Sequence, residues 1–481
     1  MEQVKNKNLT MILIGVGIVI FMSTLDSSIV TVALPVLSKA LHTNMSLINW
    51  VVTMYLIVMS STLMIFGKLG DKYGKIKFFK WGTIIFLVSS ALCALSVSWL
   101  TLIISRSLQA LGAAMTMATS NGIIVEIFPD DRRGQALGWM GSFVSLGGII
   151  GPSLGGILLN FFPWHIIFWL NVPIGIIASI ILWRYMPSKL DQTFASDSFD
   201  LVGSVMLLIG FTSMFVGILL SQQLGWADWR ILTLTIVGLL LLIWLYRYES
   251  KLTEPILPVA LFKNKWFTMQ LLACFMVFIV DFFFDVLAPF YLQNARGFSP
   301  LFSGFFLLIF PVVQLFIAPM SGSLADRHDP FKITLVGLAI ISFGQIFYVV
   351  SGLHNTVLIF GIGAALAGLG NGLFHSPNNV LVMSNVEQKD YGSAGSVYSL
   401  ARTVGMVVGS AMSTTLLFGS MSIINGSRVK SYLPSNPQLF IDGMHITFGL
   451  SCIISVILLL GIYLWHKRAT VKKDMNLENT L

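Results

Sequence analysis

The chain has 481 residues, of which 56% are apolar and only 10% are charged, and its formal net charge is +8. A soluble domain uses roughly 25% charged residues, so this composition excludes an ordinary soluble enzyme and indicates a polytopic helical membrane protein. The positive charge does not indicate a nucleic-acid-binding protein, because most Lys and Arg residues lie in short loops between apolar segments.

Fourteen apolar segments follow one another along the chain, and each is long enough to cross a bilayer. A helix needs about 20 apolar residues to span the hydrocarbon core. We therefore predict an all-α fold of fourteen transmembrane helices. The predicted spans lie near 10–36, 47–66, 79–98, 100–122, 136–160, 165–186, 199–220, 231–247, 267–293, 301–323, 333–352, 355–383, 392–419 and 443–465.

The loops that alternate with these spans carry unequal numbers of basic residues. If the N-terminus is cytoplasmic, 22 of the 29 Lys and Arg residues fall on the cytoplasmic side, 5 fall outside and 2 lie within spans. Cytoplasmic loops carry the excess of basic residues in membrane proteins. This distribution predicts that both termini are cytoplasmic and that the number of spans is even.

Two polar breaks, at 187–200 and 247–265, divide the spans into six, two and six. We predict an N-terminal six-helix bundle over 1–190, two linking transmembrane helices over 191–250 and a C-terminal six-helix bundle over 251–481. The string Gly67-Lys-Leu-Gly-Asp71-Lys after the second span returns as Gly322-Ser-Leu-Ala-Asp326-Arg327 after the second span of the later six. Transporters are often built from such internal repeats, with the binding site near the bilayer midplane.

Three acidic residues lie well inside predicted spans: Asp26, Asp281 and Asp285. A charge at mid-bilayer costs at least about 2.5–3.5 kcal/mol on insertion scales, so it usually faces a wet or paired interior. These three residues are therefore the leading functional candidates.

Two arginines also lie within spans. Arg106 lies about a turn and a half into the fourth span, where it is either an anchor that reaches the membrane surface or a partner of Asp26 or of a backbone carbonyl. A buried guanidinium needs such a partner, because leaving it unpaired at that depth is costly. Arg402 lies in the thirteenth span, where packing between helices is an equally good explanation.

Asp281 and Asp285 are four residues apart and share one helix face. Two carboxylates so close together in a low dielectric do not both ionise easily. This suits a carboxyl that loads and releases a proton near neutral pH. The alternatives are attraction of a cationic substrate and hydrogen bonding in a wet cavity.

Several other polar or amphipathic residues are expected to face the interior of the bundles, and His375 alone is more often a packed, hydrogen-bonded residue than a proton carrier. The 36 Phe and 22 Met residues fit cavities that repack around varied apolar ligands, although most of them are expected to face lipid. We predict that the cysteines Cys93, Cys274 and Cys452 are small packing residues. The interior candidates for substrate binding are Trp50, Tyr55, Asn371 and His375, beside the three acids.

Four strings carry a resemblance to a known family. Residues 67–77 form a loop whose glycines permit tight turns and whose Asp71 could lie at a helix N-terminus or pair with a nearby Lys. Glycines at 147, 151 and 155 form a face of small residues for close helix packing. The strings at 25–35 (LDSSIVTVALP), 67–77 (GKLGDKYGKIK), 147–156 (GGIIGPSLGG) and 164–175 (WHIIFWLNVPIG) together resemble the fourteen-span drug/proton antiporters of the major facilitator superfamily.

The resemblance implies a proton-coupled antiporter that exports amphipathic, often cationic, drugs or dyes by alternating access. It implies that Arg106 supports proton transfer, with Asp26, Asp281 and Asp285 as the coupling and substrate-binding acids. It also implies a bacterial plasma membrane; we expect a functional monomer without a cofactor or bound metal. The residues expected to control conformation are Gly67, Asp71, Gly74, Gly151, Pro152, Gly155, Asp326 and Arg327.

Two other functions remain open from the sequence. One is the export of a specific endogenous molecule, such as a lipid-linked sugar, a peptide or a metabolite. The other is a membrane-embedded enzyme, which is disfavoured because the chain has no H-E-x-x-H, nucleophile elbow or phosphate-binding loop. The missing phosphate-binding loop also leaves an ion gradient as the energy source. Carboxylates serve both H⁺ and Na⁺, so sodium coupling stays an alternative.

Overall fold

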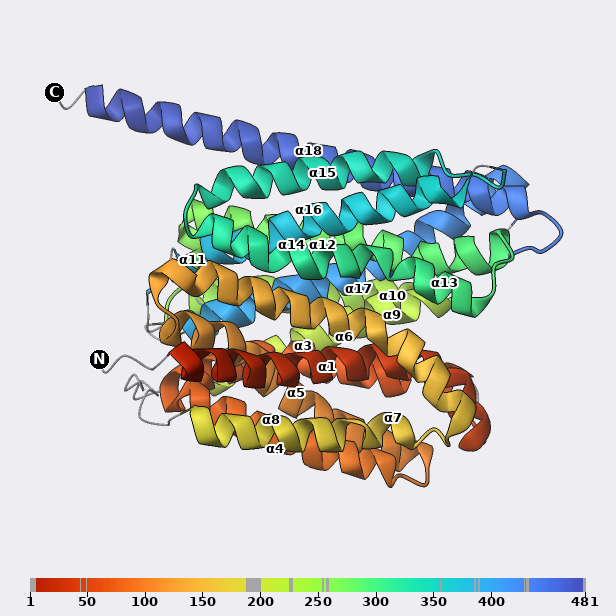
Figure 1. Cartoon of the computed structure of the whole chain (residues 1–481), viewed down its shortest axis with the longest axis horizontal. Coiled ribbons are helices and arrows are strands. Elements are labelled where there is room, and N and C mark those ends of the chain that lie inside the picture. Colours follow the sequence, from red (N-terminus) through yellow and green to blue (C-terminus); the bar gives the residue numbers. More distant parts are fainter. Residues whose placement is uncertain are drawn as a thin grey trace.

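The computed structural model describes residues 6–478, except for residues 44, 49, 187–199, 225–227, 253–254, 257–258, 355, 385, 388–389, 428 and 430–431. Within these residues the chain forms helices and connecting turns, and no strand. Helices are expected in a bilayer, because every backbone N–H and C=O must find a partner within its own segment. The long helices lie side by side, and α1 starts and α18 ends at the same end of the molecule (Figure 1). We call this end the terminus end.

The N-terminal bundle packs α1 against α6 and α8, and packs both α3 and α4 against α5. A capping box starts α5, in which the Ser98 hydroxyl accepts a hydrogen bond from the backbone N–H of Thr101. The elements are α1 (Asn6–Ala40), α2 (Met45–Ile48), α3 (Trp50–Tyr73), α4 (Lys75–Ala94), α5 (Trp99–Ile127), η1 (Asp130–Arg132), α6 (Arg133–Phe161), α7 (Ile166–Trp169) and α8 (Asn171–Tyr185).

Two helices connect the bundles: α9 (Leu201–Leu224) and α10 (Trp229–Glu249). α9 packs against α3 of the N-terminal bundle and α17 of the C-terminal bundle, while α10 packs against α9. The Ser61 hydroxyl of α3 lies 3.1 Å from the Thr212 hydroxyl of α9. Helix α9, with α10 packed against it, therefore covers one seam between the bundles. The predicted domain boundary at 190/191 lies outside the described residues.

The C-terminal bundle packs α12 against α17, and packs both α14 and α15 against α16. Two of its helices start with proline in the first turn after a side-chain cap, at Ser299 and at Asp329. The elements are α11 (Val259–Lys263), α12 (Lys265–Pro289), the π-helix η3 (Phe290–Ala295), α13 (Pro300–Leu307), α14 (Ile309–Ala325), α15 (Pro330–Val349), α16 (Val357–Met383), α17 (Tyr391–Asn425) and α18 (Pro437–Glu478).

Thirteen helices in the described part of the chain are long and apolar enough to cross a membrane. They match thirteen of the predicted spans, and the all-α membrane fold is confirmed. The remaining predicted span, 136–160, falls within α6, which is outside that set. The predicted spans 165–186 and 301–323 each contain a break, at Leu170 and Leu308, where one helix ends and the next begins.

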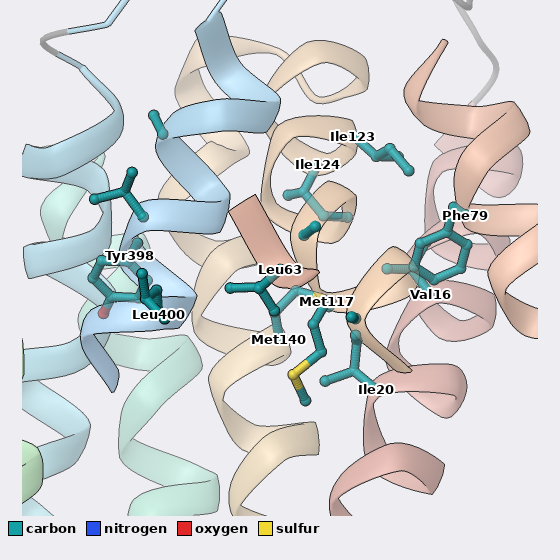
Figure 2. Packing of buried hydrophobic residues seen from close by; sticks show 14 of the residues in the cluster. Val16, Ile20, Leu63, Phe79, Met117, Ile123, Ile124, Met140, Tyr398 and Leu400 are labelled. Atoms are coloured by element: carbon teal, nitrogen blue, oxygen red, sulfur yellow. The ribbon is translucent and has the colours of Figure 1, made fainter. Parts of the chain in front are cut away.

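The two bundles meet along α6 with α14 and α16, and along α17 with α3 and α5. One buried hydrophobic cluster crosses this junction. Figure 2 shows Tyr398 and Leu400 of α17 in the same cluster as Leu63, Met117 and Met140 of the N-terminal bundle. The junction is therefore a packed hydrophobic core at this level, which holds the two bundles together.

Candidate functional site

Asp71, near the end of α3, ties the N-terminal bundle to the start of α17. Its carboxylate accepts hydrogen bonds from the backbone N–H and the hydroxyl of Ser393, both at 2.7 Å. Ser393 is in the first turn of α17, where unpaired N–H groups favour an anion. The Lys75 Nζ atom lies 3.3 Å from Asp71 Oδ1 and 3.1 Å from Glu126 Oε2. Asp71 thus takes both of its predicted partners, a helix N-terminus and a nearby lysine.

Asp326 makes the reciprocal contact from the C-terminal bundle. Its two carboxylate oxygens accept hydrogen bonds from the backbone N–H groups of Gly134 (2.8 Å) and Gln135 (3.1 Å), in the first turn of α6. Burial raises the pKa of Asp326 above its ordinary value, and the two N–H donors oppose that shift. Arg327 lies beside it and is exposed. Each repeated aspartate therefore contacts the start of a helix in the other bundle.

Small residues allow the backbones to meet beside the Asp326 contact. A Cβ atom placed on Gly322 of α14 would clash with the carbonyl oxygen of Gly134. One placed on Gly138 would clash in the same way with the carbonyl of Ala318. The Ser376 hydroxyl of α16 also donates to the Gly134 carbonyl at 3.0 Å. These contacts close the seam between the bundles near the terminus end.

The turn between α3 and α4 depends on the glycine predicted there. Gly74 has a φ of +105°, a conformation that side-chain-bearing residues rarely adopt. Gly67 is buried within the last turns of α3. The two glycines flank Asp71, so the repeat motif sets both the path of the chain and the position of its carboxylate.

Asp26 lies at the centre of a fully buried polar cluster in the N-terminal bundle. Its Oδ2 atom pairs with the Arg106 guanidinium, and its Oδ1 atom accepts hydrogen bonds from Gln109 Nε2 (2.9 Å) and Asn171 Nδ2 (2.7 Å). Arg106 also donates to the carbonyl of Val51 at 3.3 Å. Both predicted partners of Arg106, the carboxylate and a backbone carbonyl, are thus present, and its position excludes the surface-anchor alternative.

Tyr55 completes this N-terminal cluster. Its ring lies under the Arg106 guanidinium, with 4.3 Å between the guanidinium carbon and the ring centroid. Its hydroxyl donates to the Ser23 carbonyl at 3.4 Å. Tyr55 is 1% exposed, so in this conformation it contacts the buried ion pair and lies away from solvent. A desolvated guanidinium over an aromatic ring is a favourable arrangement.

Asp281 lies in a second polar cluster, in the C-terminal bundle. Its Oδ1 atom accepts a hydrogen bond from Asn371 Nδ2 at 2.8 Å, and its Oδ2 atom lies 3.6 Å from His375 Nε2. Asp285 is one helical turn further along α12 and is exposed. Within the described residues, no Lys or Arg lies within ion-pair distance of either acid. Among the described residues, the ion-pair partner of this cluster is therefore His375, which is cationic only when protonated.

The predicted interior residues thus divide between two clusters, with one exception. Trp50 packs against the hydrophobic cluster formed by α3, α9 and α17, at the seam covered by the linking helices. Gln109, Asn171, Ser393 and Glu126 were not among the predicted functional residues. A polar residue three positions from Arg106 and a lone Asn in an apolar segment were the available signals for Gln109 and Asn171. Ser393 and Glu126 carry no such signal.

The glycine face of α6 packs against α1. Ser28 donates a hydrogen bond to the Gly147 carbonyl at 2.9 Å, and a Cβ atom on Gly151 would clash with the Ser28 hydroxyl. Gly155 lies against Ile29. Pro152 lies within α6, and its side chain is outside the described part of the structure. The small residues therefore do bring two helices into close contact, as predicted.

Two bundles of membrane-spanning helices, joined by reciprocal contacts and each holding ionisable groups at membrane depth, are the arrangement of a membrane transporter. Residues 16–199 and 199–410 match the Major Facilitator Superfamily. This confirms the resemblance seen in the sequence: the chain belongs to the Major Facilitator Superfamily, whose members span the membrane many times.

Two relatives and one solved structure are similar to this chain. The chain is 34% identical over 429 residues to the riboflavin transporter RibZ of Clostridioides difficile. The aligned region covers 89% of this chain and 91% of that protein. It is 26% identical to the multidrug export protein EmrB of Escherichia coli, over 91% of this chain and 86% of that protein. The human organic anion transporter MFSD10 shares the fold, with a TM-score of 0.67 at 12% identity over 94% of this chain and 99% of that chain.

Proposed function

We propose that the chain is a proton-coupled antiporter that exports amphipathic compounds, including cationic drugs and dyes, by alternating access. The observation that carries this proposal is the cluster of Asp281, Asn371 and His375, with the exposed Asp285 one turn away. Acids at membrane depth that lack a fixed cation can be neutralised by a proton or by a cationic substrate, but not by both at once. Such competition couples the two movements.

The N-terminal cluster has a different task in this proposal. Asp26 and Arg106 neutralise each other at full burial, so protonation of Asp26 would release the guanidinium and change how α1 and α5 are held together. A proton would thereby bias the balance between two conformations, as a pH switch requires. Tyr55 and Trp50 would contact substrate in a conformation where their helices have separated.

The reciprocal contacts of Asp71 and Asp326 form in one conformation of the alternating-access cycle and break in the other. With Asp71 and Asp326 both engaged, the seam is closed near the terminus end. The distribution of basic residues supports cytoplasmic termini, and with that orientation the closed seam corresponds to an outward-facing state in a bacterial plasma membrane. Opening would break both contacts while the two bundles rock about the central region. The proposal includes an N-terminal bundle over 1–190, two linking helices over 191–250 and a C-terminal bundle over 251–481. It also includes function as a monomer.

Transport by purified protein in lipid vesicles tests the proposal. An imposed pH gradient should drive ethidium movement against its concentration gradient, and Asp281→Asn and Asp285→Asn should each slow this movement strongly, because each variant removes a carboxyl that binds the proton or the cation. Asp26→Asn should slow it as well. Asp442→Asn, at an exposed hydrogen bond with Gln438, serves as the control. Normal pumping by all three span variants contradicts the site, and drive by a sodium gradient alone contradicts proton coupling.

The second candidate function is transport of one endogenous metabolite. The 34% identity to the riboflavin transporter RibZ over most of both chains favours riboflavin as the compound to test. Vesicles loaded with riboflavin distinguish the two functions: a specific transporter moves riboflavin and ignores ethidium, whereas a multidrug exporter moves ethidium.

A further inference from the structure

Arg402 lies at membrane depth without an acidic partner. It belongs to the candidate span Ser393–Asn425 and is half-buried. Its Nη2 atom donates to the Met117 thioether sulfur at 3.0 Å, and a thioether is a weak acceptor. Its Nε atom is buried and has no hydrogen-bond partner among the described residues.

The other arginine at this depth shows what a satisfied guanidinium looks like in this protein. Arg106 is neutralised by Asp26 and has a second acceptor in Gln109, at 2.7 Å. For Arg402 the described residues provide no carboxylate within 4 Å. The nearest acid cluster does not serve it, because Asp281 is engaged by Asn371 and lies beside His375.

The groups around Arg402 are neutral. The ionisable side chains that act on its charge are the Tyr398 hydroxyl and the Cys274 thiol. The Tyr398 hydroxyl donates to the His375 carbonyl at 3.5 Å, and the Phe278 ring packs against the His375 ring at a tilt of 30°, with 4.5 Å between centroids. Arg402 therefore presents its cation where α5, α12 and α17 meet, close to aromatic surface and to the acid cluster of α12.

A guanidinium held at this depth needs an anionic acceptor, and its planar fork matches a carboxylate or a phosphate with two hydrogen bonds. We propose that Arg402 is a substrate-binding residue that takes the carboxylate of a transported amphipathic anion or zwitterion. This inference rests on the proposed transport function and extends its substrates beyond cations. The same molecule can then direct an aromatic body toward Phe278 and a cationic group toward Asp285.

The position of Arg402 also connects this binding to movement. Met117 belongs to α5 of the N-terminal bundle, whereas Arg402 belongs to α17 of the C-terminal bundle. A carboxylate that displaces the Met117 sulfur replaces a contact between the bundles with a contact to substrate. Binding at Arg402 therefore loosens the seam at the same point where the substrate is held.

Two related dyes, one with a free carboxylate and one with an esterified carboxylate, provide the test. Rhodamine B carries a free carboxylate, and rhodamine 6G is a closely related dye in which that carboxylate is esterified. Binding of each dye to purified full-length protein is followed by fluorescence anisotropy, without any ion gradient. We expect Arg402→Gln to weaken rhodamine B binding about tenfold or more, as expected for a lost charge-assisted hydrogen bond, and to change rhodamine 6G binding less than twofold. Arg402→Lys should retain part of the rhodamine B affinity.

Arg230→Gln is the matched control, because it removes an exposed cation from the first turn of α10, where its ion-pair partner is Asp228. Unchanged rhodamine 6G binding shows that each variant is folded. Equal losses for both dyes, no loss for either dye, or absence of rhodamine B binding to the native protein would overturn the proposal. Because no gradient is used, a failure of proton coupling leaves this result unaffected, so the two proposals fail separately.

Discussion

Asp71 of α3 accepts two hydrogen bonds from Ser393 of α17, and Asp326 repeats this arrangement against Gly134 at the start of α6. The two aspartates occupy matching positions in a repeated string, yet each contacts the opposite bundle. The contacts are therefore reciprocal, and both lie near the terminus end. The closed seam is therefore held by two similar contacts, and both contacts break when the bundles separate at this end.

Removing either aspartate charge should favour the conformation that is open at the terminus end. A hydrogen bond to a charged group is worth about 1.5–3 kcal/mol, so Asp71→Asn or Asp326→Asn should shift the conformational equilibrium about tenfold or more. Ser396→Cys, at the buried contact between Ser396 and the Ala118 carbonyl, reports opening through its rate of maleimide labelling in a chain without its native cysteines. Asp442→Asn, at an exposed hydrogen bond with Gln438, is the control. An unchanged labelling rate in both variants contradicts this role.

A larger residue at Gly322 should hold the same seam apart. The added methyl group of Gly322→Ala would clash with the carbonyl of Gly134, and overpacking typically costs about 1–3 kcal/mol. Gly141→Ala on α6 is the matched control, because a Cβ atom there meets nothing within 4 Å. We expect faster labelling of Ser396→Cys for the first variant only. Equal rates for the two would mean that the close backbone contact does not control opening.

Asp26→Asn should destabilise the fold as well as impair transport. It leaves the Arg106 charge buried at 0% exposure, and breaking a buried ion pair costs about 3–5 kcal/mol. Thermal unfolding in detergent should show a clear decrease for Asp26→Asn and a partial recovery for Asp26→Asn with Arg106→Gln. Asp285→Asn should unfold close to the native protein, because Asp285 is exposed. Native-like unfolding of the Asp26→Asn variant would refute the buried pair.

The glycine face of α6 should tolerate substitution on one side only. Gly151→Ala forces the new methyl group into the Ser28 hydroxyl, whereas Gly148→Ala and Gly156→Ala meet nothing within 4 Å. We therefore expect lower thermal stability and slower transport for Gly151→Ala, and native values for the two controls. If Gly151→Ala behaves like the controls, α1 and α6 do not need their close approach.

The sequence predicted the membrane class, thirteen of the spans and the depth of the acids, because those features follow from hydropathy and from the cost of burying charge. It also named Asp26 as one of two possible partners of Arg106, beside a backbone carbonyl, since few groups at that depth can satisfy a guanidinium. It did not identify the groups in the opposite bundle that Asp71 and Asp326 contact. That depends on how the two repeats dock, and Ser393 and Gly134 contribute backbone N–H groups that every residue except proline possesses.

The sequence also did not predict that the two acid clusters have different kinds of partners. Asp26 and Asp281 look alike in apolar segments, but Asp26 has an arginine partner and Asp281 has Asn371 and His375. The difference arises from packing between α1 and α5 in one case and between α12 and α16 in the other. Helix periodicity placed Asp281 and Asp285 on one face without indicating that one is half-buried and the other exposed.

The most direct test of the central claim is proton release on substrate binding. Purified protein in weakly buffered detergent near neutral pH is mixed with ethidium, and a pH-sensitive dye records the protons that appear while anisotropy records binding. The proposal predicts proton release by the native protein and its loss in the double variant Asp281→Asn with Asp285→Asn. Ethidium binding by the native protein without any proton release, or undiminished release by the double variant, would contradict the claim that these acids exchange a proton for substrate.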